Sequence, residues 1–210
     1  METRIERLGI YGGSFSPIHS GHVRAACAFL EAMDLDRLLI MPTAQSPHKP
    51  KDPWASADDR LTMCRLAFED IPAYHDGRLQ VSDFEVKREG KSYTVYTLEH
   101  FSPLVGKLFF LVGTDMFLTL SNWYRAEDIF GLCDIVLMRR ECDVVNTPLI
   151  AEKRREYEML FGARIHEIDE PPTVVSSTEL RGKLRGGMAF EGLVPQKVAD
   201  YIEKNNLYKQ

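Results

Sequence analysis

The sequence has little that would place it in a membrane, outside the cell or around a structural metal. No apolar run in its 210 residues approaches the roughly 18 needed to cross a bilayer. Residues 1–7 contain no apolar core, so we expect no signal peptide. None of the 4 cysteines belongs to a Cys-x-x-Cys pair, which argues against a zinc site. We therefore expect reduced thiols, a cytoplasmic location, and no membrane association or protein-bound metal.

Positive charge is also in short supply. The 26 Lys and Arg residues are outnumbered by 31 Asp and Glu residues, giving a net charge of −5. This balance argues against general nucleic-acid binding, and an anionic ligand would have to be held by a local basic cluster. The sequence does not decide the oligomeric state, and a homo-oligomer stays open.

What is present is an alternation of strand-like and helix-like segments, without repeats. The strand-like runs are residues 8–11, 37–41, 79–84, 107–112, 134–138 and 164–168. Such alternation predicts an α/β fold with a Rossmann-like, doubly wound parallel sheet flanked by helices. We expect a single domain over residues 1–210, with a small C-terminal helical part at about residues 175–210.

The most informative stretch is Gly-Gly-Ser-Phe-Ser-Pro-Ile-His-Ser-Gly-His, residues 12–22. It lies between the first strand-like run and a predicted helix over residues 23–33, an arrangement that presents backbone N–H groups to an anion. Gly12 and Gly13 allow close approach of the backbone to a phosphate, and His19 and His22 would project on one side. A plain turn with two surface histidines is the alternative, but the whole combination favours a phosphate cradle.

This stretch resembles the T/HxGH signature of the nucleotidyltransferase superfamily. More closely, it resembles the form GGTFDPIHxGH of the bacterial nicotinate-nucleotide adenylyltransferases. Ser14 replaces the threonine and keeps its hydroxyl, whereas Ser16 replaces the aspartate and removes a carboxylate. The resemblance implies ATP binding by Gly12, Gly13, Ser14, Phe15, His19 and His22, with Ser14 also near the acceptor nucleotide.

A second phosphate motif is predicted at Val175-Ser176-Ser177-Thr178-Glu179-Leu180-Arg181. Hydroxyl and backbone donors at a helix start can bind an anion, although Ser-Ser-Thr-Glu alone would usually be only a capping box. The segment resembles the family's I-S-S-T-x-I-R, which implies that Ser177, Thr178 and Arg181 hold the triphosphate. Lys49, in a loop that resembles the family's P-P-H-K, would contact phosphates, whereas Arg60 alone is more consistent with a solvated charge.

Two further segments resemble the family's pyridine-binding elements. Ser92-Tyr93-Thr94 resembles its S-Y-T-x-D-T-L, with Tyr96 in place of the aspartate, and a helix cap by Ser92 or Thr94 fits equally well. Trp123-Tyr124 resembles its W-Y pair, which implies that the indole of Trp123 lies over the pyridine ring. The resemblance therefore assigns the acceptor nucleotide to Ser14, Lys49, Ser92, Tyr93, Thr94, Trp123 and Tyr124.

Two strand ends complete the predicted ATP site. Gly113 and Asp115 match the family's G-x-D and would contact the ribose, although a helix cap at Thr114 or Asp115 is an even alternative. Arg139 follows the next strand-like run and would meet a phosphate or the adenine edge, and a solvated charge is as consistent with the sequence.

The resemblance implies adenylyl transfer from ATP to nicotinate mononucleotide, giving deamido-NAD and pyrophosphate in NAD biosynthesis. The catalytic residues would be His19, His22, Lys49 and Arg181, with Mg²⁺ bridging the phosphates and few protein ligands. A phosphopantetheine adenylyltransferase-like enzyme and a non-catalytic nucleotide sensor are the alternatives; the acids lost at Ser16 and Tyr96 leave the sensor open. The sequence does not decide between nicotinate and nicotinamide mononucleotide.

Overall fold

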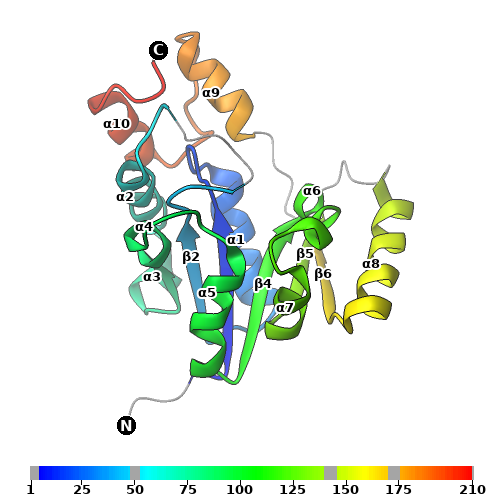
Figure 1. Ribbon diagram of the computed structural model, residues 1–210. Coiled ribbons are helices and arrows are strands. Elements are labelled where there is room, and N and C mark those ends of the chain that lie inside the picture. Colours follow the sequence, from blue (N-terminus) through cyan, green and yellow to red (C-terminus); the bar gives the residue numbers. More distant parts are fainter. Residues whose placement is uncertain (1–4, 48–52, 140–145, 170–175, 210) are drawn as a thin grey trace.

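The computed structural model describes residues 5–47, 53–139, 146–169 and 176–209. The strands are β1 (Arg7–Gly13), β2 (Arg37–Pro42), β3 (Leu79–Val81), β4 (Lys107–Gly113), β5 (Asp134–Arg139) and β6 (Ile165–Asp169). The α-helices are α1 (Ser20–Ala32), α2 (Ala57–Phe68), α3 (Pro72–His75), α4 (Phe84–Lys87), α5 (Thr94–Phe101), α6 (Thr114–Phe117), α7 (Ala126–Leu132), α8 (Thr147–Phe161), α9 (Ser177–Arg185) and α10 (Gln196–Lys204) (Figure 1). Short 3-10 turns lie at Ser102–Leu104 and Leu120–Asn122.

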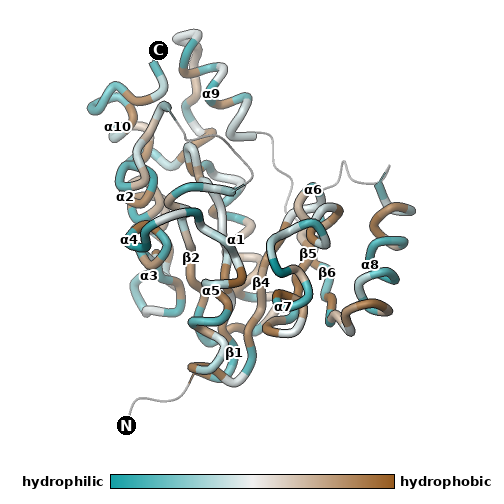
Figure 2. The backbone as a smooth tube through the Cα atoms, viewed as in Figure 1, coloured by the Kyte–Doolittle hydropathy of each residue, from teal (hydrophilic) through white to brown (hydrophobic). Residues whose placement is uncertain are grey.

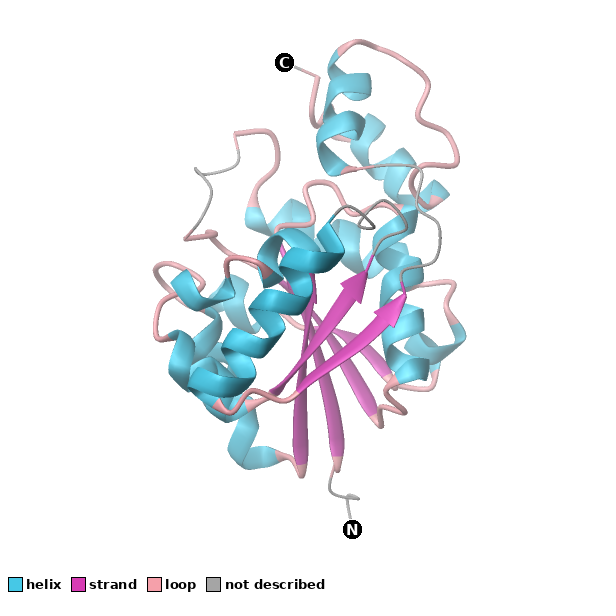
Figure 3. Ribbon diagram, turned by 90° about the vertical axis from the view of Figure 1, so that its right-hand side faces the viewer, coloured by secondary structure: helices cyan, strands magenta, loops and turns pink. Residues whose placement is uncertain are grey.

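The described strands form one parallel six-stranded sheet in the order β3-β2-β1-β4-β5-β6. This order reverses between β1 and β4, because the chain first builds outward to β3 and then crosses back to the other side of β1. The predicted Rossmann-like fold is confirmed, since this is the strand order of dinucleotide-binding sheets. The strands all point toward the end of the molecule where α9 and α10 lie (Figures 1 and 3).

Alternating side chains of the strands enter two apolar layers, one on each face of the sheet. Leu38 and Ile40 pack with helices α1, α2, α9 and α10, whereas Leu39 and Met41 pack with α5, α7 and α8. Helices on both faces explain why the central strands are apolar along most of their length (Figure 2). The rigid sheet therefore holds the loops at its carboxyl edge in fixed positions.

Two element boundaries differ from the sequence prediction by three residues. The strand expected over residues 79–84 ends at Val81, because the Ser82 hydroxyl accepts a hydrogen bond from the N–H of Phe84 at 3.2 Å and turns the chain into α4. Helix α1 begins at Ser20, three residues before the predicted start at Val23, so that His19 becomes its N-cap.

The C-terminal helices continue the apolar layer of α1 and α2. Leu180 of α9 and Val198 and Ile202 of α10 are fully buried in it, and the Tyr201 hydroxyl donates to Asp59 of α2 at 2.9 Å. No helix among the described residues is both long enough and apolar enough to cross a membrane. Cys27, Cys64 and Cys133 are free thiols, and burial raises the pKa of each.

Candidate active site

The turn that follows β1 lies where the strand order reverses. β1 pairs with β2 on one side and with β4 on the other, so the turn at Gly13 lies beside the carboxyl end of β4 at Gly113 and the start of α6 at Thr114 and Asp115. Crevices outside the carboxyl ends of strands at such a switch point are where open α/β sheets bind ligands. Helix α6 has Gly113 as its N-cap and no side-chain cap, so the capping alternative for Thr114 and Asp115 is wrong. Asp115 is exposed at this edge.

His19 and His22 form a reciprocal pair at the start of α1. Nδ1 of His19 accepts a hydrogen bond from the His22 N–H at 3.3 Å, and Nδ1 of His22 accepts one from the His19 N–H at 3.2 Å. The two rings are stacked, with centroids 3.7 Å apart. Because a neutral imidazole has one donor and one acceptor nitrogen, each ring carries its proton on Nε2. The two Nε2–H groups are therefore set as donors on the same side of the helix start.

The turn between β1 and α1 holds a strained residue. Phe15 is buried with a φ of 45°, a conformation that non-glycine residues rarely adopt and that clusters at ligand sites. Its ring lies edge-on to Tyr11 and His22, with centroids 5.4 and 5.2 Å away. A Cβ on Gly13 would lie 3.0 Å from this ring, so Gly13 makes room for Phe15 as well as leaving its backbone open.

The late phosphate motif touches the early one directly. Nη1 of Arg181 donates to the carbonyl of Ser16 at 2.7 Å, and the Ser177 hydroxyl donates to the carbonyl of Pro17 at 3.2 Å. Nη2 of Arg181 also donates to the Thr178 hydroxyl at 3.1 Å. Residues 160 or more positions apart in the sequence are thus joined at the turn that leads into His19 and His22.

The capping box predicted at the start of α9 is also present. Its N-cap is Ser176, whose hydroxyl accepts from the Glu179 N–H, so the cap leaves Ser177 and Thr178 in the first turn of the helix. Lys49, which the sequence assigns to the phosphates, lies outside the described residues.

The structure contradicts the interpretation of Arg60 as a solvated charge. Arg60 is 4% exposed, and its guanidinium donates to the carbonyl of Ser14 at 2.7 Å and to those of Thr43 and Ala44 at 2.6 and 3.0 Å. It therefore connects the turn after β1 to the loop after β2. The sequence does contain a pattern that indicates this burial. In α2 the residues Arg60, Met63, Cys64 and Ala67 follow helical spacing, which places Arg60 on the same inner face as the apolar residues.

The predicted pyridine segments lie on the other face of the sheet, at the start of α5 and after α6. Helix α5 has Tyr93 as its N-cap without a side-chain cap, so the capping roles considered for Ser92 and Thr94 are wrong. The Tyr93 ring packs on Tyr124 at 4.7 Å, and Tyr124 is exposed. Trp123 is half-buried, edge-on to Phe110 with centroids 6.3 Å apart, and so is less exposed than its polar neighbours suggest.

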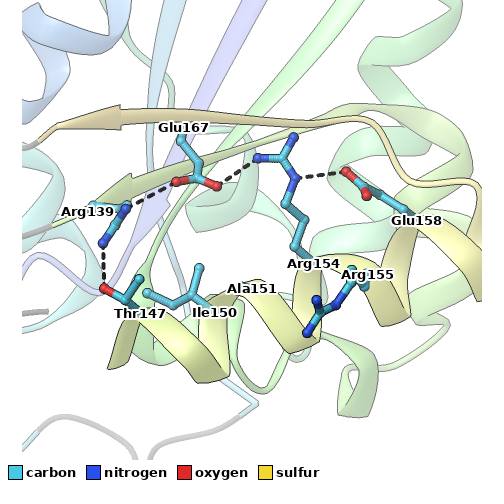
Figure 4. Close-up of a pocket in the computed structure, with 8 residues that line it drawn as sticks. All are labelled: Arg139, Thr147, Ile150, Ala151, Arg154, Arg155, Glu158 and Glu167. Atoms are coloured by element: carbon cyan, nitrogen blue, oxygen red, sulfur yellow. Dashed lines mark hydrogen bonds and ion pairs between the residues drawn. The ribbon is translucent and has the colours of Figure 1, made fainter. Parts of the chain in front are cut away.

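Arg139 is placed apart from the histidine pair, in contacts with β6 and α8. Its guanidinium contacts Glu167 at 3.5 Å and donates to the Thr147 hydroxyl at 2.9 Å (Figure 4). It lines a groove of about 300 Å³ with Ile150, Ala151, Arg154, Arg155 and Glu158. Arg154 is paired with Glu158 and Glu167, so this groove is largely charge-compensated.

No group of three or more His, Cys, Asp or Glu side chains in the described part of the chain could hold a metal ion. The cations and N–H donors of the site instead suit phosphate oxygens. A cradle of this kind at the switch point of a Rossmann-type sheet is typical of a nucleotide-binding α/β protein.

Comparison with known proteins narrows this class. The cytidylyltransferase-like family model matches residues 10–183. A Caldicellulosiruptor saccharolyticus protein named "probable nicotinate-nucleotide adenylyltransferase" is 35% identical over 97% of this chain and 100% of its own length. A Thermotoga maritima protein of the same name is 36% identical over 94% of this chain and 91% of its own. The chain therefore belongs to the cytidylyltransferase-like family and, within it, to the nicotinate-nucleotide adenylyltransferases.

A solved structure shows the same fold at lower identity. The nicotinic acid mononucleotide adenylyltransferase of Plasmodium falciparum, complexed with NaAD, superimposes with a TM-score of 0.76. It is 19% identical, with 97% of each chain covered.

Proposed function

We propose that this enzyme transfers the adenylyl group of ATP to nicotinate mononucleotide, giving deamido-NAD and pyrophosphate. The observation that carries the proposal is the direct contact between the two phosphate motifs, Arg181 to Ser16 and Ser177 to Pro17. Two motifs held together in this way supply donors to a single polyphosphate. The names of the relatives, and the NaAD in the Plasmodium falciparum structure, support the same pyridine nucleotide reaction.

The reaction requires alignment and charge stabilisation. The acceptor phosphate, with a second pKa of about 6 for comparable phosphates, is already largely dianionic at neutral pH and needs no general base. Its oxygen attacks the α-phosphorus of ATP in line with the bond to the leaving pyrophosphate. In this proposal the Nε2–H groups of His19 and His22 stabilise charge on the transferring group, while Arg181, Ser177 and Thr178 bind the triphosphate.

Arg181 can serve both as a structural link and as a ligand-binding residue. A guanidinium has five N–H donors, and the hydrogen bonds to Ser16 and Thr178 use only part of that set. Lys49 is proposed to add charge at the same phosphates. Mg²⁺, brought in with ATP, would supply further neutralisation of the phosphate charge beside these residues.

The acceptor's pyridine ring is proposed to bind at the start of α5. Backbone N–H groups in the first turn of a helix have no partner within that helix, so they favour a carboxylate on the ring. Ser92, Tyr93 and Thr94 form this segment, and Trp123 and Tyr124 supply aromatic surface beside it. We therefore propose nicotinate mononucleotide as the better acceptor, and the cytoplasm, with its free thiols reduced, as the location.

A non-catalytic sensor is the second candidate, motivated by the acids that the chain lacks. The Ser16 hydroxyl hydrogen-bonds the hydroxyl of Tyr208 at 3.1 Å, and the ring of Tyr96 lies 6.0 Å from that of Tyr124 and 5.0 Å from the guanidinium of Arg88. His19, His22 and Arg181 of the proposed catalytic set are nevertheless all present.

The test is pyrophosphate release by the purified protein with ATP, Mg²⁺ and either pyridine mononucleotide. We expect turnover with both mononucleotides absent to be negligible, and kcat/KM to be higher for nicotinate than for nicotinamide mononucleotide. Absence of pyrophosphate with either acceptor, in a protein that binds ATP, would favour the sensor. A higher kcat/KM with the amide would overturn the proposed acceptor preference.

A further inference from the structure

A short segment lies between the two halves of the proposed acceptor site. We name Thr43, Ala44 and Gln45 the bridging segment; it directly follows β2. On one side it meets the turn after β1, where the Thr43 N–H donates to the carbonyl of Gly13 at 3.0 Å. On the other side it meets the start of α5, where the Ser92 N–H donates to the carbonyl of Gln45 at 2.9 Å. The segment therefore spans the space between the phosphate end and the pyridine end of the site.

Arg60 fixes the first of these sides. Its buried guanidinium reaches the carbonyls of Ser14, Thr43 and Ala44 together. Three carbonyls at 2.6 to 3.0 Å from one planar group fix the distance between the turn and the bridging segment. A lysine, with a single ammonium, would hold fewer of them.

Ser92 fixes the second side, and Glu85 supports it. The Ser92 hydroxyl accepts from the Ala44 N–H at 3.0 Å and lies next to the carboxyl of Glu85, whose charged form it stabilises. Glu85 is 5% exposed, and its Oε1 also accepts from the Thr97 hydroxyl of α5 at 2.6 Å. Burial raises the pKa of Glu85, while the hydroxyls of Thr97 and Ser92 act in the opposite direction. A buried carboxyl, costly to place, thus lies against two hydroxyls, that of Ser92 before α5 and that of Thr97 within it.

We propose that Arg60 and Glu85 are positioning residues for the acceptor nucleotide, which together hold the bridging segment and so set the separation between the phosphate cradle and the start of α5. The inference rests on the proposed function. A mononucleotide that is bound at its ring by one segment and presents its phosphate at another is aligned for in-line attack only if that separation is fixed. Small errors of placement are costly, because misplacement by about 1 Å can lower a rate by about a hundredfold.

The test compares Glu85→Met, which removes the hydrogen-bond acceptors, with Glu85→Gln, which keeps an oxygen for Thr97 and Ser92. We expect E85M to lower kcat/KM for the mononucleotide by about tenfold or more while changing KM for ATP by less than about twofold, and E85Q to recover most of the loss. Thr97→Val, an isosteric change, should lower kcat/KM for the mononucleotide in the same direction with a smaller effect. It replaces E85M as the test variant if E85M does not fold.

Arg60 is tested in combination with Glu85. Arg60→Lys should also lower kcat/KM for the mononucleotide, and the double variant R60K/E85M should lose less than the product of the two single losses, since both act on one segment. Independent, multiplicative effects would overturn the joint role. So would an E85M variant whose KM for ATP rises as much as that for the mononucleotide.

A matched control separates positioning from stability. Asp134 is a fully buried carboxylate at the opposite, amino end of the strands, so Asp134→Asn should lower the melting temperature without raising KM for the mononucleotide. If D134N raised KM for the mononucleotide as much as E85M does, the proposal would be overturned. If the wild-type protein releases no pyrophosphate, the proposed function fails instead, and titration of nicotinate mononucleotide into E85M and wild-type protein then decides the positioning role by affinity alone.

Discussion

At the scale of the residue, the histidine pair shows how backbone contacts set side-chain chemistry. Each ring accepts the other's backbone N–H at Nδ1, so the tautomer of both rings is fixed before a ligand binds. The stacked arrangement also limits ring rotation. Donors prepared in this way need little reorganisation when negative charge develops on a transferring phosphoryl group.

His22→Ala should therefore lower kcat by about a hundredfold to a thousandfold, the loss seen when one preorganised donor is removed from a developing oxyanion. ATP affinity should change much less. Steady-state kinetics and an ATP titration measure the two quantities, with the exposed His75→Ala as the control. A variant that loses ATP affinity but keeps kcat would contradict a catalytic role.

The sequence identified these histidines and Arg181 because each belongs to a contiguous motif. It misjudged Arg60 as a solvated charge and suggested a helix cap for Ser92, because the partners of both residues are distant in the chain: Arg60 bonds Ser14, 46 residues earlier, and Ser92 bonds Ala44, 48 residues earlier. Local patterns favour a solvated charge and a helix cap for such residues. Only the sheet order brings their true partners within reach.

At the scale of the element, the amino ends of three strands are joined by a charge cluster. Asp134 at the start of β5 is fully buried and is contacted by Lys107 of β4, by Arg164 before β6 and by His166 of β6. Burial disfavours the charged form, but hydrogen bonds from Lys107, His166 and Arg164 outweigh it and hold the pKa of Asp134 below its usual range. The ionised carboxylate therefore ties β4, β5 and β6 together at the edge opposite the site.

Because the folded-state pKa of Asp134 is lowered, its contribution to stability is present above the unfolded pKa of about 3.9 and is lost as pH falls through the folded value. Asp134→Asn should lower the free energy of unfolding by about 1–3 kcal/mol at pH 7. Urea unfolding measured across pH should show this difference shrinking below about pH 4. A difference that is independent of pH would exclude this linkage.

Element types were predicted more accurately than their limits. The apolar runs of β1, β2, β4 and β5 identify buried parallel strands, since both faces of the sheet are covered. The short edge strand β3 was predicted too long, because alternation continues past Val81 while the Ser82 side chain ends the strand by a local hydrogen bond. Periodicity does not detect that competition.

At the scale of the whole molecule, the C-terminal part is attached to the turn after β1 at several points. Besides Arg181 and Ser177, the Ser20 N–H donates to the carbonyl of Leu193 at 2.9 Å, and Tyr208, 2% exposed, hydrogen-bonds Ser16. The sequence predicted that the two motifs meet, from their shared chemistry. It did not predict Tyr208, because nothing in its neighbourhood marks a residue that packs against the turn.

Tyr208→Phe should lower the free energy of unfolding by about 1 kcal/mol, the net value of a typical hydrogen bond, and Tyr208→Ala by about 3–5 kcal/mol, as for a buried aromatic side chain. Both should reduce turnover, because the turn loses support. Denaturant unfolding and initial rates measure these effects, with Tyr74→Phe of α3 as the control. Unchanged turnover in Tyr208→Ala would show that the site does not need the support that Tyr208 gives to the turn after β1.

The attachment of the chain's last helices to its first turn has a consequence for biosynthesis. During translation the amino-terminal part of a chain emerges first. Strands β1 and β2 can therefore pair, with α1 packed on them, before Arg181 and Tyr208 have been synthesised. The nucleotide cradle is complete only when residues 177–208 have been added. A ribosome that stops before residue 177 would then release a product with much of its sheet but no finished cradle, so that synthesis through residue 208 is itself a condition for nucleotide binding.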